Sequence, residues 1–205
     1  MKITARRLQL RLSQVLGATK KGYAVDTFEG GFPVVQTMEN IAAASASAVR
    51  AAYTLDATAT DIATSITSPS HYRNLTVLGN QASVYGNVVI TGRDWADRLI
   101  QETILASGTT SGVGNLPFKE VLNVNFPAKA AAGDTISIGT GEKLGLYRPV
   151  SAAADLVLTE KKASGATYFQ EDTAGTLSTT YDTVDVNGSI TGNDSFKFHY
   201  LTDVF

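Results

Sequence analysis

The chain has 205 residues, of which 43% are hydrophobic and 18% charged, with a formal net charge of −2 at pH 7. This length and apolar content suit one sizeable domain, or one domain with an extension, and argue against global disorder. The absence of cysteine excludes disulfide bonds, thiolate metal sites and cysteine nucleophiles. No apolar run approaches the roughly 18 residues of a transmembrane helix.

The charge is unevenly spread along the chain. Residues 1–21 carry six basic side chains and no acidic one, whereas the remaining 184 residues carry 11 basic and 19 acidic side chains. Such asymmetry predicts that the basic end meets an acidic surface. The residues that we expect to make this contact are Arg6, Arg7, Leu8, Arg11, Leu12, Lys20 and Lys21.

The first 52 residues are predicted to form a basic arm with short helices. Apolar residues at Ile3, Leu8, Leu12, Val15 and Leu16 fit one helical stripe over residues 2–16, although the leucines at 8, 10 and 12 also fit a strand. A helix of this length needs a partner for its apolar face. Residues 17–37 are rich in glycine and predict an extended arm, and the alanine-rich stretch Glu39–Ala52 predicts a second helix.

From residue 53 onward, short alternating segments separated by Gly, Asn and Asp predict strands. The expected strands are Tyr53–Ala57, Asp61–Ile66, Asn74–Leu78, Gly86–Thr91, Leu99–Leu105, Phe118–Phe126, Thr135–Ile138, Leu156–Leu158, Thr167–Gln170, Thr183–Val186 and Phe196–Leu201. The segment at 99–104 also fits a helical turn, and residues 147–156 fit a crossing loop.

This pattern predicts a mainly β protein, an antiparallel β-sandwich of Ig-like or jelly-roll-like type, preceded by the short helix and the arm. The expected organisation is an arm over residues 1–52 and a sandwich over 53–205. The latter has a potential division into 53–148 and 149–205.

The motifs that suggest chemistry are weak. His71 and His199 are 128 positions apart, and a metal site usually needs three or four protein ligands. The stretch Gly139–Gly145 lacks the Gly-Lys-Ser/Thr ending of a phosphate loop, so a turn between two strands is expected. Oxygen ligands for Ca²⁺ could come from Asp182, Asp185, Asn187, Asn193 and Asp194, but this cluster fits hairpin turns better. We therefore expect no cofactor and no resident metal.

Two surfaces are candidates for partner contacts. Trp95 follows Asp94 at an expected exposed turn that ends at Arg98, where an aromatic side chain suits either an interface anchor or the rim of the core. The basic arm could contact nucleic acid, but it lacks the aromatic residues that stack bases. Docking onto an acidic protein explains its cations and its leucines together and is favoured.

Several motifs between residues 61 and 146 together resemble a known domain. They are Arg73–Val77, Gly86–Asp94, Glu102–Ile104, Gly108–Thr110, Phe118, Pro127 and Lys143–Leu146, with a looser likeness at Tyr181–Tyr200. This series resembles a domain found in virion structural proteins of tailed bacteriophages. Those proteins tend to have a glycine-containing turn where this chain has Trp95–Arg98, which makes this turn a candidate contact of its own.

The resemblance implies an assembly component of the virion, made in the bacterial host cytoplasm and without catalytic residues. We expect a capsid decoration or cement protein that binds the major capsid protein lattice, stabilises the head and is a homo-oligomer in the particle. A tail, neck or head–tail connector protein is the first alternative. A receptor- or carbohydrate-binding module is the second, since sandwiches often carry such sites on their loops. An enzyme is the least favoured reading, and no membrane partner is expected.

Overall fold

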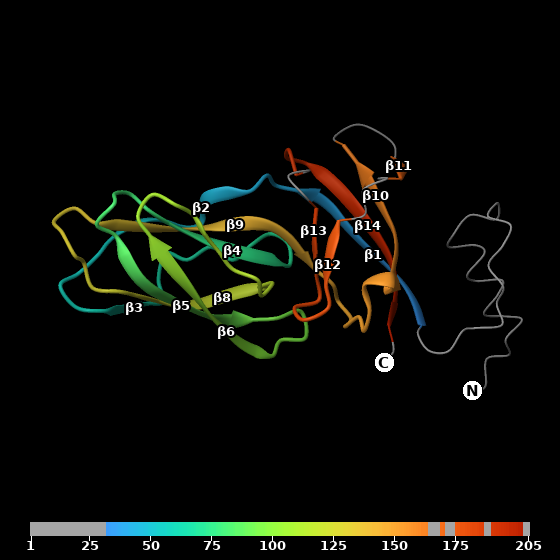
Figure 1. Ribbon diagram of the computed structural model, residues 1–205, viewed down its shortest axis with the longest axis horizontal. Helices are drawn as coiled ribbons and strands as arrows, with labels where there is room; N and C mark the ends of the chain where they lie inside the picture. The colour runs from blue at the N-terminus through green and yellow to red at the C-terminus, as the bar shows by residue number, and fades with distance from the viewer. Residues whose placement is uncertain (1–31, 164–168, 171–174, 187–189, 203–205) are drawn as a thin grey trace, which may run out of the picture.

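The computed structural model describes residues 32–163, 169–170, 175–186 and 190–202 (Figure 1). The described chain is mainly β, and one short 3₁₀ helix (Ala153–Asp155) interrupts it. The strands are β1 (Phe32–Ile41), β2 (Ser45–Thr54), β3 (Thr60–Ile62), β4 (Arg73–Gly79), β5 (Tyr85–Arg93), β6 (Leu99–Ser107), β7 (Gly112–Val113), β8 (Glu120–Phe126), β9 (Thr135–Gly145), β10 (Leu156–Lys162), β11 (Phe169–Gln170), β12 (Thr176–Ser178), β13 (Thr183–Asp185) and β14 (Asp194–Thr202).

The strands pair into three sheets. Sheet A has the order β1-β14-β10-β11, and sheet C has the order β3-β8-β5-β6. Sheet B has the order β12-β13-β9-β4-β7, and β2 also pairs with β9. The strand pairings are antiparallel. The mainly β, antiparallel part of the expected fold class is therefore confirmed, whereas the Ig-like or jelly-roll-like sandwich type stays a prediction.

Two buried apolar clusters hold the sheets together. Core 1 takes side chains from sheets B and C, among them Leu75, Val77, Val88, Ile90, Ile104, Val124, Phe126, Ile136 and Ile138. Core 2 takes side chains from sheet A, from β13 and from the end of β9, among them Met38, Ile41, Leu144, Val184, Phe196, Phe198 and Tyr200. The long strand β9 contributes to both cores and runs from one half of the molecule into the other (Figure 1).

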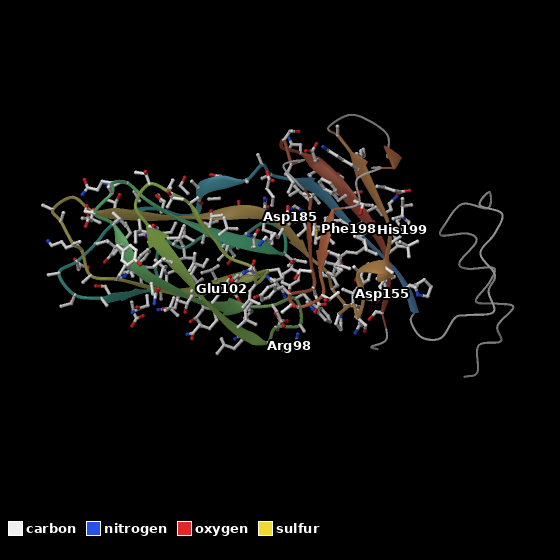
Figure 2. The ribbon with its side chains drawn as sticks, in the orientation of Figure 1. Arg98, Glu102, Asp155, Asp185, Phe198 and His199 are labelled. Atoms are coloured by element: carbon white, nitrogen blue, oxygen red, sulfur yellow. The ribbon has the colours of Figure 1, made fainter. Side chains whose placement is uncertain are left out.

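The alternation of side chains along each strand decides which face is buried. In β14, Phe198 points into core 2 and His199 lies on the opposite side of the strand (Figure 2). His199 is nevertheless buried, and its Nε2 lies 3.5 Å from a carboxylate oxygen of Glu160, which also pairs with Lys197 at 3.2 Å. The second histidine of the chain is thus packed on sheet A.

The helix expected over Glu39–Ala52 is wrong, because these residues belong to β1 and β2 and to the link between them. High helix propensity of alanine amounts to a few tenths of a kcal/mol per residue, and long-range pairing overrides it. Strand β2 pairs with β9, so that Arg50 lies opposite Ile138, and Val49 enters core 1. The extended arm expected over residues 17–37 likewise includes the start of β1. The helix expected over 2–16 lies outside the described residues.

The turn expected at Gly139–Gly145 is also wrong, since these residues continue β9. Glycine is needed there because another chain segment approaches the strand closely: a Cβ on Gly139 would lie 2.1 Å from the Ser45 carbonyl oxygen. The segment at 99–104 is strand β6 and not a helical turn. The expected boundary between residues 52 and 53 falls inside β2, and that between 148 and 149 falls in the link from β9 to β10.

A buried arginine joins the two halves. Arg73 begins β4 and is 1% exposed. Its guanidinium donates through Nε to the Gly141 carbonyl at 2.7 Å, through Nη2 to the same oxygen, and through Nη1 to the Ala42 carbonyl at 2.8 Å. Its backbone N–H and carbonyl both bond Phe118. Burial lowers the pKa of Arg73 from 12.5 to about 10, so the group stays charged at neutral pH.

Replacing this arginine tests its role. Arg73→Met leaves the buried Gly141 carbonyl and the Ala42 carbonyl without their donor, and we expect the free energy of unfolding to fall by about 3 kcal/mol. Lys129→Met, which removes an exposed cation, is the control and should change it little. Urea denaturation of both variants measures the difference. Equal stability of the two variants would show that the guanidinium does not join the halves.

A buried carboxylate organises the opposite end of core 1. Asp134 accepts hydrogen bonds from Ser83 Oγ at 2.6 Å and Gln81 Nε2 at 2.5 Å, and from the backbone N–H groups of Ala131 and Ala130 at 2.7 and 2.9 Å. The side-chain donors of Ser83 and Gln81 stabilise the ionised Asp134 carboxylate most, and the two backbone N–H groups add to this effect. Together these donors lower the pKa of Asp134 from 3.8 to about 2.

This shift predicts acid sensitivity with a defined sign. A carboxylate with a lowered folded pKa contributes stability above pH 4 that is lost as the pH falls toward 2. We expect the thermal midpoint of the wild type to fall more between pH 4 and pH 2 than that of Asp134→Asn, which cannot titrate. The variant should be the less stable protein at pH 7. Parallel pH profiles of wild type and variant would contradict this assignment.

Candidate functional site

An open pocket of about 390 Å³ lies at one end of sheets B and C. Its lining residues are Pro69, Ser70, His71, Tyr72, Trp95, Lys119 and Tyr147. They come from the segment before β4, the turn after β5, the residue before β8 and the segment after β9. Antiparallel pairing brings these points together, because the start of β4 pairs with the end of β9 and the start of β8 pairs with the end of β5.

Three aromatic rings form one wall of the pocket. Tyr147 lies between the other two, with its ring centroid 6.4 Å from that of Tyr72 and 6.4 Å from that of Trp95. The planes are inclined by 32° and 43°, so the rings are tilted against one another rather than stacked. The guanidinium of Arg148 lies 5.4 Å above the Trp95 ring. Tyr147 is 42% exposed and offers its ring to solvent.

Two glycines of the sequence motifs make room for this wall. A Cβ on Gly145 would lie 2.1 Å from the ring of Tyr72, so only glycine lets that ring pack against the end of β9. A Cβ on Gly92 would lie 2.1 Å from the Glu120 carbonyl oxygen, so glycine also lets β8 approach the end of β5. The motif glycines therefore position the loops of the pocket.

The turn that carries Trp95 is held by Asp94. This carboxylate is buried; its Oδ1 accepts from the N–H groups of Ala96 and Arg98, at 2.8 and 2.9 Å, and its Oδ2 accepts from Arg98 Nε at 2.7 Å. Asp97 takes a φ of +61°, a conformation that Asp and Asn tolerate better than most residues. The chain thus makes its left-handed turn with an aspartate instead of a glycine.

Ser70 and His71 form the polar side of the pocket. The Ser70 hydroxyl lies 3.1 Å from His71 Nδ1, and the His71 ring also faces the Glu39 backbone carbonyl. Because a neutral ring donates from one nitrogen only, donation to Glu39 leaves Nδ1 to accept the Ser70 proton. Burial lowers the pKa of His71, which keeps the ring neutral at pH 7.

A third polar group, Lys119, is exposed at the rim and pairs with the Asp97 carboxylate at 2.7 Å. On the aromatic side, burial raises the pKa of Tyr72, so its hydroxyl is protonated. The pocket therefore combines an ammonium group, three hydroxyls and a neutral imidazole with three aromatic rings.

This arrangement suits binding. A local hydrogen bond between a consecutive serine and histidine does not make a nucleophilic site, which also needs donors placed for the developing oxyanion. Within the part of the chain that the structure describes, no group of three or more His, Asp or Glu residues could hold a metal ion. Asp182, Asp185 and Asp194 accordingly form no such group there, and Asn187 of the same predicted cluster lies outside the described residues.

The predicted contact residues fall into two sets. Asp94, Trp95 and Arg98 meet in the turn beside the pocket, and the largely exposed Arg98 lies at the lower edge of the molecule in Figure 2. Asp94 is buried and fully engaged in the turn, whereas Trp95 reaches the pocket. The remaining set, Arg6, Arg7, Leu8, Arg11, Leu12, Lys20 and Lys21, lies outside the described residues.

Sequence reasoning missed most of the pocket. Tyr72, Lys119, Tyr147 and Arg148 were not expected near Trp95, because they are distant in sequence and none belongs to a recognised motif of binding. The available signal was indirect: Tyr72 and Lys119 directly precede a strand, and Tyr147 and Arg148 lie two and three residues after the end of β9, where neighbouring antiparallel strands meet.

The chain matches no protein-family model, no curated protein and no solved structure. Among the described residues, no helix is long and apolar enough to cross a membrane.

The role of Asp94 can be tested with the single tryptophan of the chain. Asp94→Ala removes the acceptor of three hydrogen bonds, and we expect the free energy of unfolding to fall by about 2 kcal/mol. Trp95 emission should shift to the red as the turn loosens. Asp97→Asn, on the same turn, keeps a residue that tolerates the left-handed conformation and should leave emission unchanged. A wild-type spectrum for Asp94→Ala would refute this account of the turn.

Proposed function

We propose that this protein is a capsid decoration protein of a tailed bacteriophage, which binds the lattice of the major capsid protein and stabilises the head. In this proposal, sheets B and C form a β-sandwich around core 1, and the protein acts by presenting surfaces. The observation that carries the proposal is the outer face of β5 and β6 in sheet C, which is poor in charge and exposes large apolar side chains.

The outer face of sheet C is defined by the side chains that alternate away from core 1. On β5 and β6 these are Tyr85, Asn87, Val89, Thr91, Arg93, Leu99, Gln101, Thr103, Leu105 and Ser107. Arg93 is the one charged residue among these ten positions, and it pairs with Glu120 at 3.5 Å. Depletion of charge and exposure of large apolar side chains are features of contact surfaces between proteins.

Three large apolar side chains on this face are exposed: Tyr85 at 66%, Leu99 at 67% and Leu105 at 43%. Tyr85 and Leu105 are diagonal neighbours at one end of the β5–β6 pair, since Tyr85 lies opposite Ser107 and Leu105 lies opposite Asn87, whereas Leu99 lies opposite Arg93 at the other end. Apolar side chains set among uncharged polar ones can be desolvated at low cost when a flat partner covers them. A capsid lattice offers such a partner many times over.

The basic residues of 1–21 supply a second contact in this proposal. Their charge of +6 is opposite to that of the rest of the chain, which is −8. Two contacts on one chain raise the effective concentration of each, so that individually weak contacts hold the protein on a symmetric lattice. Lattice attachment by both surfaces is favoured over the role of a tail, neck or connector protein, for which a ring of subunits would be required.

The resemblance of residues 61–146 to phage virion proteins supports the same assignment. Most of the motif residues lie on β4, β5, β6 and β9, which contribute to core 1, whereas Gly108–Thr110, Phe118 and Pro127 lie in the links beside β6 and β8. At Gly92 and Gly145 neighbouring atoms lie so close that a Cβ would clash with them, which explains glycine at both positions. The motifs therefore describe one packed body rather than a set of unrelated turns.

Binding to heads that lack decoration tests the proposal. Purified protein is mixed with undecorated heads, and occupancy and the temperature of head disruption are measured. We expect saturable binding at micromolar concentration and a higher disruption temperature. Thr103→Glu, which places a charge in the middle of the outer face of β6, should weaken binding at least tenfold, which corresponds to about 1.4 kcal/mol.

Thr180→Glu is the matched control, because Thr180 is exposed on the turn between β12 and β13. It should decorate heads like the wild type. If the wild-type protein does not bind heads at micromolar concentration, the proposed function is wrong. Equal binding by Thr103→Glu and Thr180→Glu would instead show that the outer face of sheet C is not the contact surface. A stable ring of six or twelve subunits in solution would favour the neck or tail.

A further inference from the structure

The aromatic pocket has the properties of a small-ligand site that attachment to a lattice does not require. Its volume of about 390 Å³ falls within the range of about 300–1,000 Å³ that is common for such sites. It lies at the loop end of sheets B and C, beside Trp95, whereas the proposed lattice contact is the flat outer face of sheet C. The protein could therefore occupy both at once.

The aromatic wall sets the first requirement on a ligand. Arg148 covers one face of Trp95, and the tilted ring of Tyr147 continues the surface beside it. An aromatic face carries partial negative charge and attracts weakly positive C–H groups. A ligand that fits this wall has a flat, rigid surface of C–H groups.

The polar side of the pocket sets the second requirement. The ammonium of Lys119 uses one donor on Asp97 and has others left, and the Ser70 oxygen, which donates its proton to His71, keeps free acceptor capacity. A donor and an acceptor side by side match hydroxyl groups, each of which can both accept and donate. The ligand is therefore rich in hydroxyls around its apolar surface.

The charges set the third requirement. Lys119 and Arg98 are each paired with an aspartate at 2.7 Å, and the Arg148 guanidinium lies over the face of Trp95, so the pocket lacks the row of free cations that contacts a nucleic-acid backbone. The lining also comes from loops and not from a free strand edge, which is the feature that binds extended peptides through their backbone. These features favour an uncharged ligand over a polyanion or a peptide strand.

A pyranose ring meets all three requirements, because it has a C–H face and a rim of hydroxyls. We propose that the pocket binds a sugar ring of an uncharged saccharide, with its C–H face on Trp95 and Tyr147 and its hydroxyls on Lys119 and Ser70. The chemical class is that of bacterial surface polysaccharides. This activity is additional to lattice binding and does not depend on it.

The proposal is tested with an array of bacterial surface oligosaccharides that includes neutral and acidic sugars. A proline-rich peptide is added to the array as a further probe. Labelled full-length protein is applied to the array, and the best uncharged binder is titrated while the emission of Trp95 is followed. As the single tryptophan of the chain lies in the pocket, its emission reports occupancy of this site. We expect a saturable change with an uncharged sugar.

Tyr147→Ala should weaken this binding at least tenfold, and Lys119→Met should weaken it as well. Tyr85→Ala, which removes an exposed tyrosine at the far end of β5, should bind the sugar like the wild type. The unfolding midpoint of each variant is measured to check that it is folded. If Tyr147→Ala is destabilised, the test of sugar binding rests on Lys119→Met, because Lys119 is exposed.

The proposal is overturned if no uncharged sugar binds, if Tyr147→Ala and Lys119→Met both bind like the wild type, or if only acidic sugars or the peptide change Trp95 emission. Its failure is distinguishable from failure of the proposed function, because Tyr147→Ala should still decorate undecorated heads.

Discussion

The buried guanidinium of Arg73 is the contact on which the arrangement of the two halves depends. It reaches the Ala42 carbonyl in the link between β1 and β2 and the Gly141 carbonyl in β9. Both of these segments pass from core 1 to core 2. A planar cation with five donors can hold two carbonyl groups in fixed directions, which a lysine ammonium or an apolar side chain cannot do. The cation is thus desolvated to satisfy backbone groups where the chain crosses between the cores.

This crossing point also determines where the pocket lies. Arg73 directly follows Tyr72, and its backbone bonds Phe118, the neighbour of Lys119. Fixing Arg73 therefore fixes two lining residues from opposite sheets, and the close approach of Tyr72 to Gly145 brings the segment of Tyr147 to the same place. The Asp94 turn adds Trp95 from the end of β5. A site built from loops is in this way supported by a buried, hydrogen-bonded residue of the core.

The sequence predicted the strands best where the alternation is strong and turn residues punctuate it, as in β4, β5 and β14. It failed at β2, where Ala and Ser give no alternation of apolar and polar residues, and at the end of β9, where glycines serve close packing and not a turn. For the site, it found Asp94, Trp95 and Arg98 as a unit because they are adjacent. It could not bring Tyr72, Lys119 and Tyr147 to Trp95, since only the pairing of distant strands does so.

The fold separates two kinds of surface, and this separation links the structure to both proposals. Strand alternation places mostly uncharged side chains on the outer face of β5 and β6, so this face suits a broad partner, and one added charge can disrupt the contact. At the ends of the sheets, in contrast, the loops bring side chains from distant segments together around a pocket. Such a pocket suits a small ligand that is held by a few hydrogen-bonding groups. Because antiparallel strands place their loops at the ends and their faces between them, one chain can be attached by a face while its pocket stays open to a second partner.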